Sequence, residues 1–432
     1  MKKILQSIHV ISHSVAKQII LLAQKDIPVP PRSAVISYLK NFANIPCTIP
    51  LFILIIFVPL ILTCITNFTG INFNGQLYGY FDNPPTKINF SLRNYFNREY
   101  QKNVEQRFNS DINLREQYIR LYNQIQFTFF KLAPQKIIGK NNDLFEYPYI
   151  DAECGLSKAN DFSIPENFKR LKDYVNHLQS IQNKLHKIDK YFIFYTTPSK
   201  ATYDYKNIPL KYRLKKRADY KQPYFFLKEL ISSRNINYID SRDFFSKDNL
   251  PIFYTTGIHW ARPLEQRISQ AIVKKMSVLS NQNFPEIILK EIKTSKEPYR
   301  RDADLFELTN VFSKPNGLYY EYKVDIKKEQ DFNEPMFLIQ GGSFSEGFYT
   351  FDYYTYSRDS YKIFYDQILK NKDSEQPVLK WENIDFTSIL NNIDFVIIEL
   401  NEAAISSYSS GFVEFLDSFL DTYISQVSNP AG

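Results

Sequence analysis

The sequence predicts a mixed α/β body with a mostly parallel sheet, preceded by one membrane-spanning helix and a helical stalk. Three observations lead to this prediction: an uncharged apolar stretch near the N-terminus, a helical pattern after it, and a long remainder in which short apolar runs alternate with helical periodicity. With 432 residues, of which 44% are hydrophobic and 23% charged, the chain can bury a sizeable core. Wholesale disorder and a collagen-like chain are therefore excluded.

The positive charge of the chain is concentrated at its N-terminus. The net charge is +7, and residues 1–44 contribute +5 of it, with six Lys or Arg against the single acid Asp26. The rest of the chain carries 47 basic and 45 acidic side chains, which is too balanced for a surface that follows nucleic-acid phosphates. We therefore expect no nucleic-acid partner.

Cysteine usage limits the chemistry further. Only three cysteines are present, and Cys47 and Cys64 lie in or beside the apolar stretch, which leaves Cys154 alone in the polar remainder. A disulfide framework and a cysteine-based zinc site are excluded on this count. We expect neither a metal nor a cofactor.

The apolar stretch predicts a transmembrane helix over residues 45–68. No charged residue occurs between Lys40 and Asp82, and residues 48–65 within that gap have about the length that crosses a bilayer. A buried core helix is the alternative, but two prolines and the absence of strongly polar groups favour lipid. The basic excess before the span predicts a single-pass protein of the cell membrane, with a cytoplasmic N-terminus and an extracytoplasmic C-terminal domain.

Residues 1–44 are predicted to form a cytoplasmic amphipathic leader. Apolar residues recur at alternating four- and three-residue steps from Ile4 to Leu22, which places one apolar stripe on a helix. The inner face of the membrane or a membrane-embedded partner can cover this stripe. Packing against residues 33–44 as a helical hairpin is the alternative.

The remainder divides into a stalk and a body. Residues 69–134 are predicted to be a helical stalk, with a helical pattern from about Ser91 to Leu132 that is interrupted near residues 109–111. In the body, residues 135–432, four apolar runs rich in β-branched and aromatic residues predict buried strands. These runs are residues 191–195, 236–239, 336–339 and 395–400.

Helices are expected between these strands. The clearest begins at Ser163, where Ser163 and Glu166 have capping-box spacing, and two more cover about 222–232 and 264–279. This alternation predicts a mostly parallel sheet, and in such a sheet functional groups lie at the carboxyl ends of strands.

One such strand end carries a candidate nucleophile. The run 336–339 leads into Gly341-Gly342-Ser343, a turn that can expose a serine hydroxyl and leave backbone N–H groups free for an oxyanion, although most such turns are only turns. Of the three histidines after the predicted span, two belong to the helix that begins at Ser163. The third, His259, precedes a helix start and is the good candidate for a general base. A purely structural histidine packed on Trp260 is the alternative.

Six segments, in order along the body, resemble the SGNH-hydrolase-like proteins of the alginate O-acetyltransferase type. They are residues 137–146, 197–200, 239–240, 255–260, 341–345 and 397–402. The first looks like the family's G-K-(D/N)-G-W-L-F segment, the fourth like its D-x-H-W motif and the fifth like its G-D-S-F-S nucleophile turn. The histidine precedes the serine, as in that family. The resemblance implies an SGNH-hydrolase-like sandwich that attaches acetyl groups to exported polysaccharides.

Carried over by resemblance, Ser343 is the nucleophile, His259 is the base, and the backbone N–H groups of Gly342 and Ser343 bind the oxyanion. The chain departs from the family at two positions, because Gly257 and Gly342 stand where the family has aspartates. A histidine without its orienting acid loses about 10⁴-fold in a serine protease. Another carboxylate or a carbonyl must then hold the imidazole, and three acids at or near strand ends are candidates: Asp240, Glu399 and Glu402.

The resemblance implies an extracytoplasmic O-acyltransferase. It would modify a cell-surface or exported polysaccharide through a serine acyl-enzyme, with acetyl as the expected acyl group, beside a polytopic membrane-bound O-acyltransferase. Two alternatives stay open. A catalytically degenerate subunit could bind glycan or scaffold such a complex, and a carbohydrate esterase could use the same site with water as the acceptor.

Overall fold

The computed structural model describes most of the chain after its N-terminal segment. The described residues are 48–71, 73, 75–79, 86, 88–245, 250–327, 331–350, 360–365, 367–370, 379–380, 383–407 and 411–428. The amphipathic leader expected in residues 1–44 lies outside them. Contacts divide the chain into two units, one of Met1–Gln76 with Phe81–Tyr118 and the other of Leu77–Tyr80 with Ile119–Gly432. The predicted stalk, residues 69–134, is thus shared between the two units.

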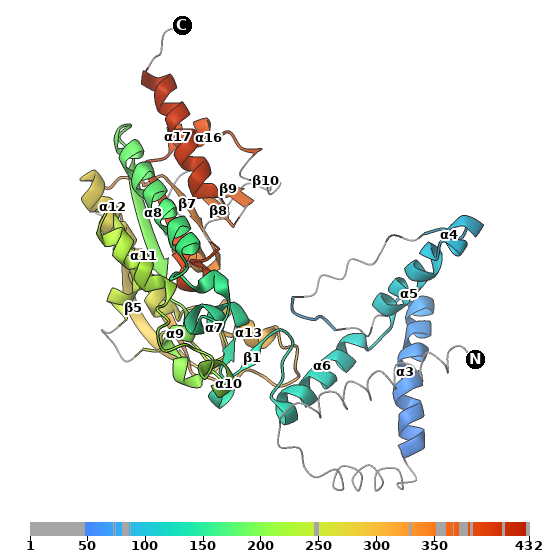
Figure 1. Cartoon of the computed structure of the whole chain (residues 1–432). Helices are drawn as coiled ribbons and strands as arrows, with labels where there is room; N and C mark the ends of the chain where they lie inside the picture. The colour runs from blue at the N-terminus through green and yellow to red at the C-terminus, as the bar shows by residue number, and fades with distance from the viewer. Residues whose placement is uncertain are drawn as a thin grey trace. The chain divides into compact units, whose positions relative to one another are not determined.

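The first unit is built from helices. It contains α3 (Thr48–Thr69), α4 (Leu92–Phe96), α5 (Glu99–Asp111) and the start of α6 (Arg115–Ile125) (Figure 1). On α3, the hydroxyls of Thr63 and Thr66 accept hydrogen bonds from the backbone and side-chain amides of Asn113, at 2.9 and 3.0 Å. Among the described residues no helix combines the length and the apolar character needed to cross a membrane, so the expected span is not supported.

The helical pattern expected from Ser91 to Leu132 is present, but its interruptions differ. The break expected near 109–111 lies after Asp111, and Leu114 there adopts a left-handed φ of 63°. A further break at Arg98 separates α4 from α5. After α6 the chain continues as a π-helical turn, Gln126–Phe130, and then enters the body.

The body is a mixed α/β fold around a mostly parallel sheet, as the sequence predicted. Its strand order is β10-β9-β8-β7-β11-β3-β4. The strands are β3 (Tyr191–Thr197), β4 (Tyr238–Asp240), β7 (Phe337–Gly341), β8 (Tyr361–Phe364), β9 (Gln367–Lys370), β10 (Leu379–Lys380) and β11 (Phe395–Asn401). All neighbours from β8 to β4 pair in parallel, whereas β9 and β10 pair antiparallel. The four predicted apolar runs supply β3, β4, β7 and β11.

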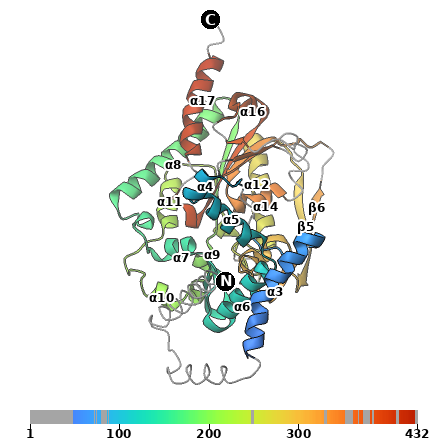
Figure 2. The same ribbon diagram turned by 90° about the vertical axis from the view of Figure 1, so that its right-hand side faces the viewer.

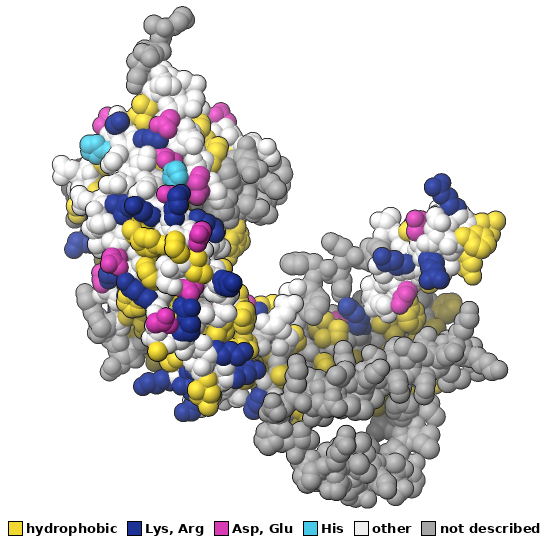
Figure 3. All heavy atoms as spheres, in the orientation of Figure 1, with side chains coloured by type: hydrophobic (Ala, Val, Ile, Leu, Met, Phe, Trp, Pro, Cys, Tyr) yellow, Lys and Arg dark blue, Asp and Glu magenta, His cyan; other side chains and the backbone are white. Residues whose placement is uncertain are grey.

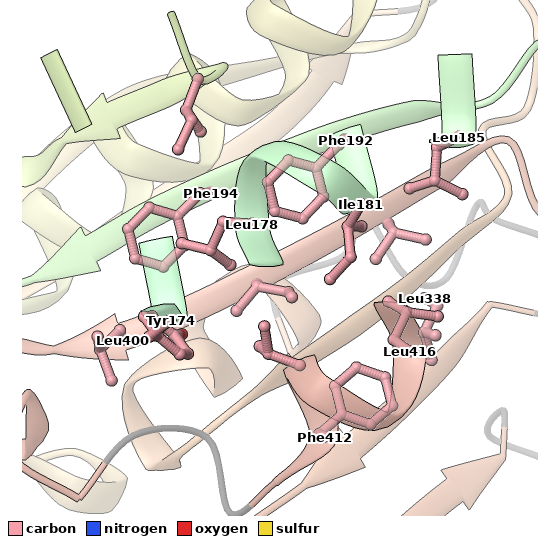
Figure 4. Close-up of a cluster of buried hydrophobic side chains, with 14 of the residues drawn as sticks. Tyr174, Leu178, Ile181, Leu185, Phe192, Phe194, Leu338, Leu400, Phe412 and Leu416 are labelled. Carbon is pink, nitrogen blue, oxygen red and sulfur yellow. The ribbon is translucent and has the colours of Figure 1, made fainter. Parts of the chain in front are cut away.

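Helices cover both faces of this sheet because alternate side chains of each strand point to opposite faces. On one face lie α8 (Pro165–His186), α11 (Pro223–Ser232), α16 (Phe386–Asn392) and α17 (Phe412–Ser428). Figure 4 shows that core, in which Phe192 and Phe194 of β3 meet Leu178 and Ile181 of α8. On the other face, α12 (Arg262–Ser280) packs on Ile193 of the same strand. Figure 2 shows the sheet between these helices.

The clearest predicted helix, α8, starts differently from the expectation. No capping box forms, because the Ser163 hydroxyl binds the Asp161 carboxylate and the N-cap is Ile164. Pro165 then occupies the first turn, where a missing N–H costs nothing. The helices expected at 222–232 and 264–279 are confirmed as α11 and α12.

Shorter elements complete the body. They include β1 (Ile137–Ile138), β2 (Leu144–Phe145), α7 (Tyr147–Cys154), α9 (Lys200–Tyr203), α10 (Leu210–Arg213), the hairpin of β5 (Glu286–Ser295) and β6 (Tyr319–Lys327), η6 (Arg300–Ala303), α13 (Asp304–Glu307), η7 (Ser343–Ser345) and α14 (Glu346–Thr350). On the face of the body seen in Figure 3, Lys and Arg side chains are intermixed with Asp and Glu over most of the surface. This view agrees with the near-balanced charge that the sequence gives residues after 44.

Candidate active site

Ser343 stands at the carboxyl end of the central strand β7. The strand ends at Gly341, and the 3₁₀ turn η7 begins two residues later. Close packing requires glycine at 341, since a Cβ there would lie 2.7 Å from Glu399 Cβ and 2.9 Å from Ser345 Cβ. The Ser345 N–H and hydroxyl both donate to the Gly342 carbonyl, at 3.1 and 2.6 Å, and close the turn.

Ser343, His259 and Asp304 form a continuous hydrogen-bonded chain. Ser343 Oγ lies 2.8 Å from His259 Nε2, and His259 Nδ1 lies 2.7 Å from Asp304 Oδ2. The imidazole is largely buried, with 12% of its side chain exposed. This is the arrangement of a serine hydrolase triad, in which the carboxylate fixes the tautomer and the opposite nitrogen accepts the serine proton.

Asp304 is held as a carboxylate. Its Oδ1 accepts the backbone N–H groups of Ile258 and Leu305, both at 2.9 Å, while Oδ2 faces His259. Burial alone raises the pKa of Asp304, but the hydrogen bonds from His259 and the backbone outweigh burial and keep the pKa below its ordinary value. Because Asp304 is ionised, His259 Nδ1 carries the proton and Nε2 is free to accept from Ser343.

The acids that sequence reasoning proposed as orienters lie elsewhere. Glu402 accepts both Nε and Nη2 of Arg242, each at 2.7 Å. Asp240 Oδ2 accepts the Lys228 ammonium and the Tyr224 hydroxyl, both at 2.6 Å. Neither carboxylate contacts His259, because both belong to an ion-pair network at the strand ends of β3, β4 and β11.

Glu399 does not orient His259 either, and its position changes the expected oxyanion site. One carboxylate oxygen accepts the Thr197 hydroxyl, and the other accepts the Gly342 N–H at 2.8 Å. Burial raises the pKa of Glu399. The Gly342 N–H is therefore bound within the fold and is not free for an oxyanion. The Ser343 N–H donates to no group in the described part of the chain, so it keeps that capacity.

Gly257 shows why the acid comes from another segment. A Cβ at 257 would lie 2.7 Å from the Asp302 carbonyl, 3.1 Å from Asp304 Oδ1 and 3.2 Å from the Arg301 carbonyl. The segment that delivers Asp304 thus occupies the space that a side chain at 257 would need. A carboxylate two residues before His259 and the Asp304 carboxylate cannot both be accommodated without a backbone shift.

Two of the resemblance motifs hold the loop that carries His259. The fully buried Lys200 donates to the carbonyls of Tyr254 and Gly257, both at 2.7 Å, and pairs with Asp143 at 2.9 Å. The Leu144 N–H donates to the Thr255 carbonyl at 2.9 Å. Residues 137–146 and 197–200 therefore hold the backbone of the loop that carries His259 in place.

A pocket of about 260 Å³ opens beside Ser343 between the ends of β7 and β11. Tyr149, Tyr365 and Asn401 are among its lining residues. Tyr365 adopts a left-handed φ of 55°, and its ring lies 3.3 Å from where a Cβ of Gly342 would be. No group of three or more metal-ligating side chains occurs among the residues that the structure describes.

Sequence reasoning missed Asp304 and its neighbour Arg301, whose Nη1 lies 3.3 Å from His259 Nε2. Both belong to a polar run, residues 300–304, without strand or helix periodicity. Asp304 follows His259 by 45 residues, and no spacing rule links two loops at that separation.

Comparisons with known proteins give similarity to solved structures only. No protein-family model and no curated protein sequence matches the chain. The O-acetyltransferase domain of Pseudomonas putida AlgJ is similar with a TM-score of 0.43 at 14% identity, covering 66% of this chain and 99% of that one. Pseudomonas aeruginosa AlgX follows with 0.37 at 12% identity, covering 65% and 66%. Bacillus cereus PatB1 with a sulfonyl adduct gives 0.37 at 9%, covering 57% and 93%. Similarity at this level decides nothing about function, which must be argued from the site.

Proposed function

We propose that this protein is an extracytoplasmic serine O-acyltransferase that moves an acyl group, with acetyl expected, onto a hydroxyl of a cell-surface or exported polysaccharide. The observation that carries the proposal is the unbroken chain from Ser343 through His259 to Asp304. The motif resemblance supports acetyl as the acyl group and a polysaccharide as the acceptor, and the site geometry supports the serine chemistry.

The first half of the reaction forms an acyl-enzyme. Ser343 Oγ attacks the carbonyl carbon of an acyl ester while its proton passes to His259 Nε2. The Ser343 N–H is placed to donate to the tetrahedral oxyanion. As the intermediate collapses, the bond to the donor's oxygen breaks, and that oxygen leaves with the proton from Nε2. The Asp304 carboxylate stabilises the imidazolium throughout.

The second half repeats these steps with a sugar hydroxyl. The hydroxyl gives its proton to Nε2 and attacks the acyl carbon of Ser343, and the serine oxygen leaves and regains the proton. No net oxidation or reduction occurs. If water takes the place of the sugar, the same site is an esterase, so the accepted nucleophile distinguishes the two enzymes.

The geometry favours an enzyme over a degenerate scaffold. The alternative of a catalytically degenerate subunit rests on the absence of two family aspartates, but Asp304 supplies a carboxylate to His259. A scaffold has no need of a buried, ionised acid aligned with a histidine and a serine. The polytopic membrane-bound O-acyltransferase partner in this proposal rests on the motif resemblance, and the extracytoplasmic location rests on the charge asymmetry of residues 1–44.

Acylation of the serine tests the proposal directly. The full chain is mixed with an acyl-ester donor, and a covalent adduct on Ser343 is sought by peptide mass spectrometry. Ser343→Ala and His259→Ala should abolish the adduct. His177→Ala is a matched control, since His177 also faces an aspartate, Asp417, through Nδ1 at 2.7 Å but lies on α8 away from the serine. Absence of an adduct on the wild-type serine would refute the proposal.

The isolated acyl-enzyme is then used to test which acceptor takes the acyl group. Oligosaccharides should remove the acyl group from Ser343 faster than buffer does and should appear as acylated sugars. Release into water alone, at a rate that sugars leave unchanged, would make the protein an esterase.

A further inference from the structure

One short segment contacts both nitrogens of His259. Asp304 faces Nδ1, and Arg301, three residues earlier in η6, places Nη1 3.3 Å from Nε2. The same Nη1 lies 2.7 Å from the backbone carbonyl of Ser343. The segment that supplies the acid of the triad therefore also reaches the nucleophile turn.

Arg301 is anchored to the other end of that turn as well. Its Nη1 lies 2.8 Å from Glu346 Oε2, and Glu346 opens α14 immediately after η7. Its Nη2 lies 3.9 Å from the buried Glu265 on α12. The guanidinium thus bridges η6 to the start and the end of the serine turn, and less than a third of its side chain is exposed.

Arg301 Nη1 holds the nucleophile turn by a hydrogen bond and an ion pair. The nitrogen hydrogen-bonds to the Ser343 carbonyl at 2.7 Å and to His259 Nε2 at 3.3 Å, and it forms an ion pair with Glu346 Oε2 at 2.8 Å. A neutral imidazole nitrogen has one lone pair, and the Ser343 hydroxyl approaches Nε2 at the shorter distance of 2.8 Å, so the Arg301 contact with Nε2 is the weaker of the two. The contacts with the Ser343 carbonyl and with Glu346 are therefore the ones that bind the nucleophile turn.

We propose that Arg301 is a positioning residue for acyl transfer, which clamps the Ser343 turn so that Oγ stays within hydrogen-bond reach of His259 Nε2. The proposal rests on the proposed function for its role in transfer, but the clamp itself is a statement about the nucleophile. Charge-assisted hydrogen bonds are the strong ones, and a displacement of about 1 Å in a reacting group can lower a rate about 10²-fold.

The clamp is measured with a probe that needs no natural donor. Phenylmethylsulfonyl fluoride forms a sulfonyl ester with an activated serine and releases fluoride, and mass spectrometry follows the reaction at Ser343 in the full chain. Arg301→Gln should slow this sulfonylation about 10²-fold, and Arg301→Lys, which keeps the charge but loses the second donor nitrogen, about 10-fold. Arg234→Gln changes a half-buried arginine just after α11 that donates to the Leu230 carbonyl, and this variant should react like the wild type.

Rescue separates positioning from general structural damage. Ethylguanidinium should restore part of the rate in Arg301→Ala and none in Ser343→Ala, and the melting temperature of Arg301→Gln should stay near that of the wild type. In acyl transfer, Arg301→Gln should lower kcat and leave KM for the donor within about threefold of the wild-type value. An unchanged sulfonylation rate, or a loss that follows melting and is not rescued, overturns the proposal.

The two proposals fail in different ways. A wild-type Ser343 that reacts with the sulfonyl fluoride but accepts no acyl group contradicts the O-acyltransferase, while the comparison with Arg301→Gln still decides the clamp. A wild-type Ser343 that is inert to the probe contradicts both, because an aligned serine, histidine and aspartate should be reactive.

Discussion

Gly257→Asp tests whether the site has replaced its missing family aspartate. If His259 had no acid, restoring the D-x-H spacing should raise activity. The structure predicts the opposite, because the new Cβ would lie 2.7 Å from the Asp302 carbonyl and 3.1 Å from Asp304 Oδ1. Contacts below 3.0 Å against backbone require the segment Arg301–Asp304 to move, and a second carboxylate beside Asp304 adds like-charge repulsion.

The expected magnitude follows from what that segment holds. Moving Asp304 off Nδ1 removes the acid of the triad, and this loss costs up to about 10⁴-fold, or about 5 kcal/mol in the barrier. We expect Gly257→Asp to lower the Ser343 acylation rate by about 10²–10⁴-fold. Gly257→Ala introduces the steric clash without the second carboxylate, so it should lower the Ser343 acylation rate less than Gly257→Asp does.

The assay is single-turnover acylation of Ser343 followed by mass spectrometry, with a melting curve for each variant. A double variant, Gly257→Asp with Asp304→Ala, shows whether an acid at 257 can serve when the Asp304 carboxylate is absent. Because the Asp302 carbonyl still lies 2.7 Å from the new Cβ, its rate should stay at or below that of Asp304→Ala alone. An increase in rate for Gly257→Asp in the wild-type background would refute the reasoning, since it would mean that Asp304 does not orient His259.

Three further predictions follow from the same geometry and from the sequence. Asp304→Asn should lower the acylation rate about 10⁴-fold with little change in KM, whereas Asp240→Asn should leave the rate within a few-fold; equal effects in single-turnover assays would contradict the assignment. Burial raises the pKa of Asp302 to about 6, so the folded protein holds this proton more tightly than the unfolded chain, and stability falls as pH rises from about 4 to 6. In the wild type, the free energy of unfolding measured in urea should therefore fall by about 3 kcal/mol between pH 4 and 6, and Asp302→Asn should not show this fall. The same pH dependence of unfolding in both proteins would contradict the prediction. The charge asymmetry of residues 1–44 predicts an extracytoplasmic C-terminus, so a reporter fused after Gly432 should be active outside the cytoplasm, and activity confined to the cytoplasm would end that prediction.

A fourth prediction concerns the loop beneath His259. Lys200→Met leaves the buried Asp143 carboxylate without its ion-pair partner and frees two loop carbonyls, so it should destabilise the body by about 3–5 kcal/mol and slow acylation. Adding Asp143→Asn should recover part of the stability but not the rate, because the loop anchor stays absent. Chemical denaturation and single-turnover acylation measure the two effects. Full recovery of both would show that Lys200 serves only to neutralise Asp143.

Sequence periodicity was sufficient for the strands β3, β4, β7 and β11 and for the helices α8, α11 and α12, although α17 was not predicted. Strands such as β3 and β11 are buried on both faces, so their apolar runs are continuous and bounded by polar residues. The helical period of the apolar residues in α8 has the same kind of cause, because this helix buries one side against one face of the sheet. The start of α8 was misjudged because Ile164, not Ser163, is the N-cap, and the Ser163 hydroxyl instead donates to the Asp161 carboxylate.

The sequence by itself predicted four strands of the central sheet, their alternation with helices, and a candidate pair of reactive residues, Ser343 after a strand and His259 before a helix. Only the tertiary structure decided which acid completes the site and which amide is free for an oxyanion. Asp304 reaches His259 because the loop around Gly257 leaves room for the segment before α13, and Glu399 takes the Gly342 N–H because β11 lies beside β7. The physical reason is range: periodicity reports burial within one element, whereas contacts between loops depend on the packing of the whole fold.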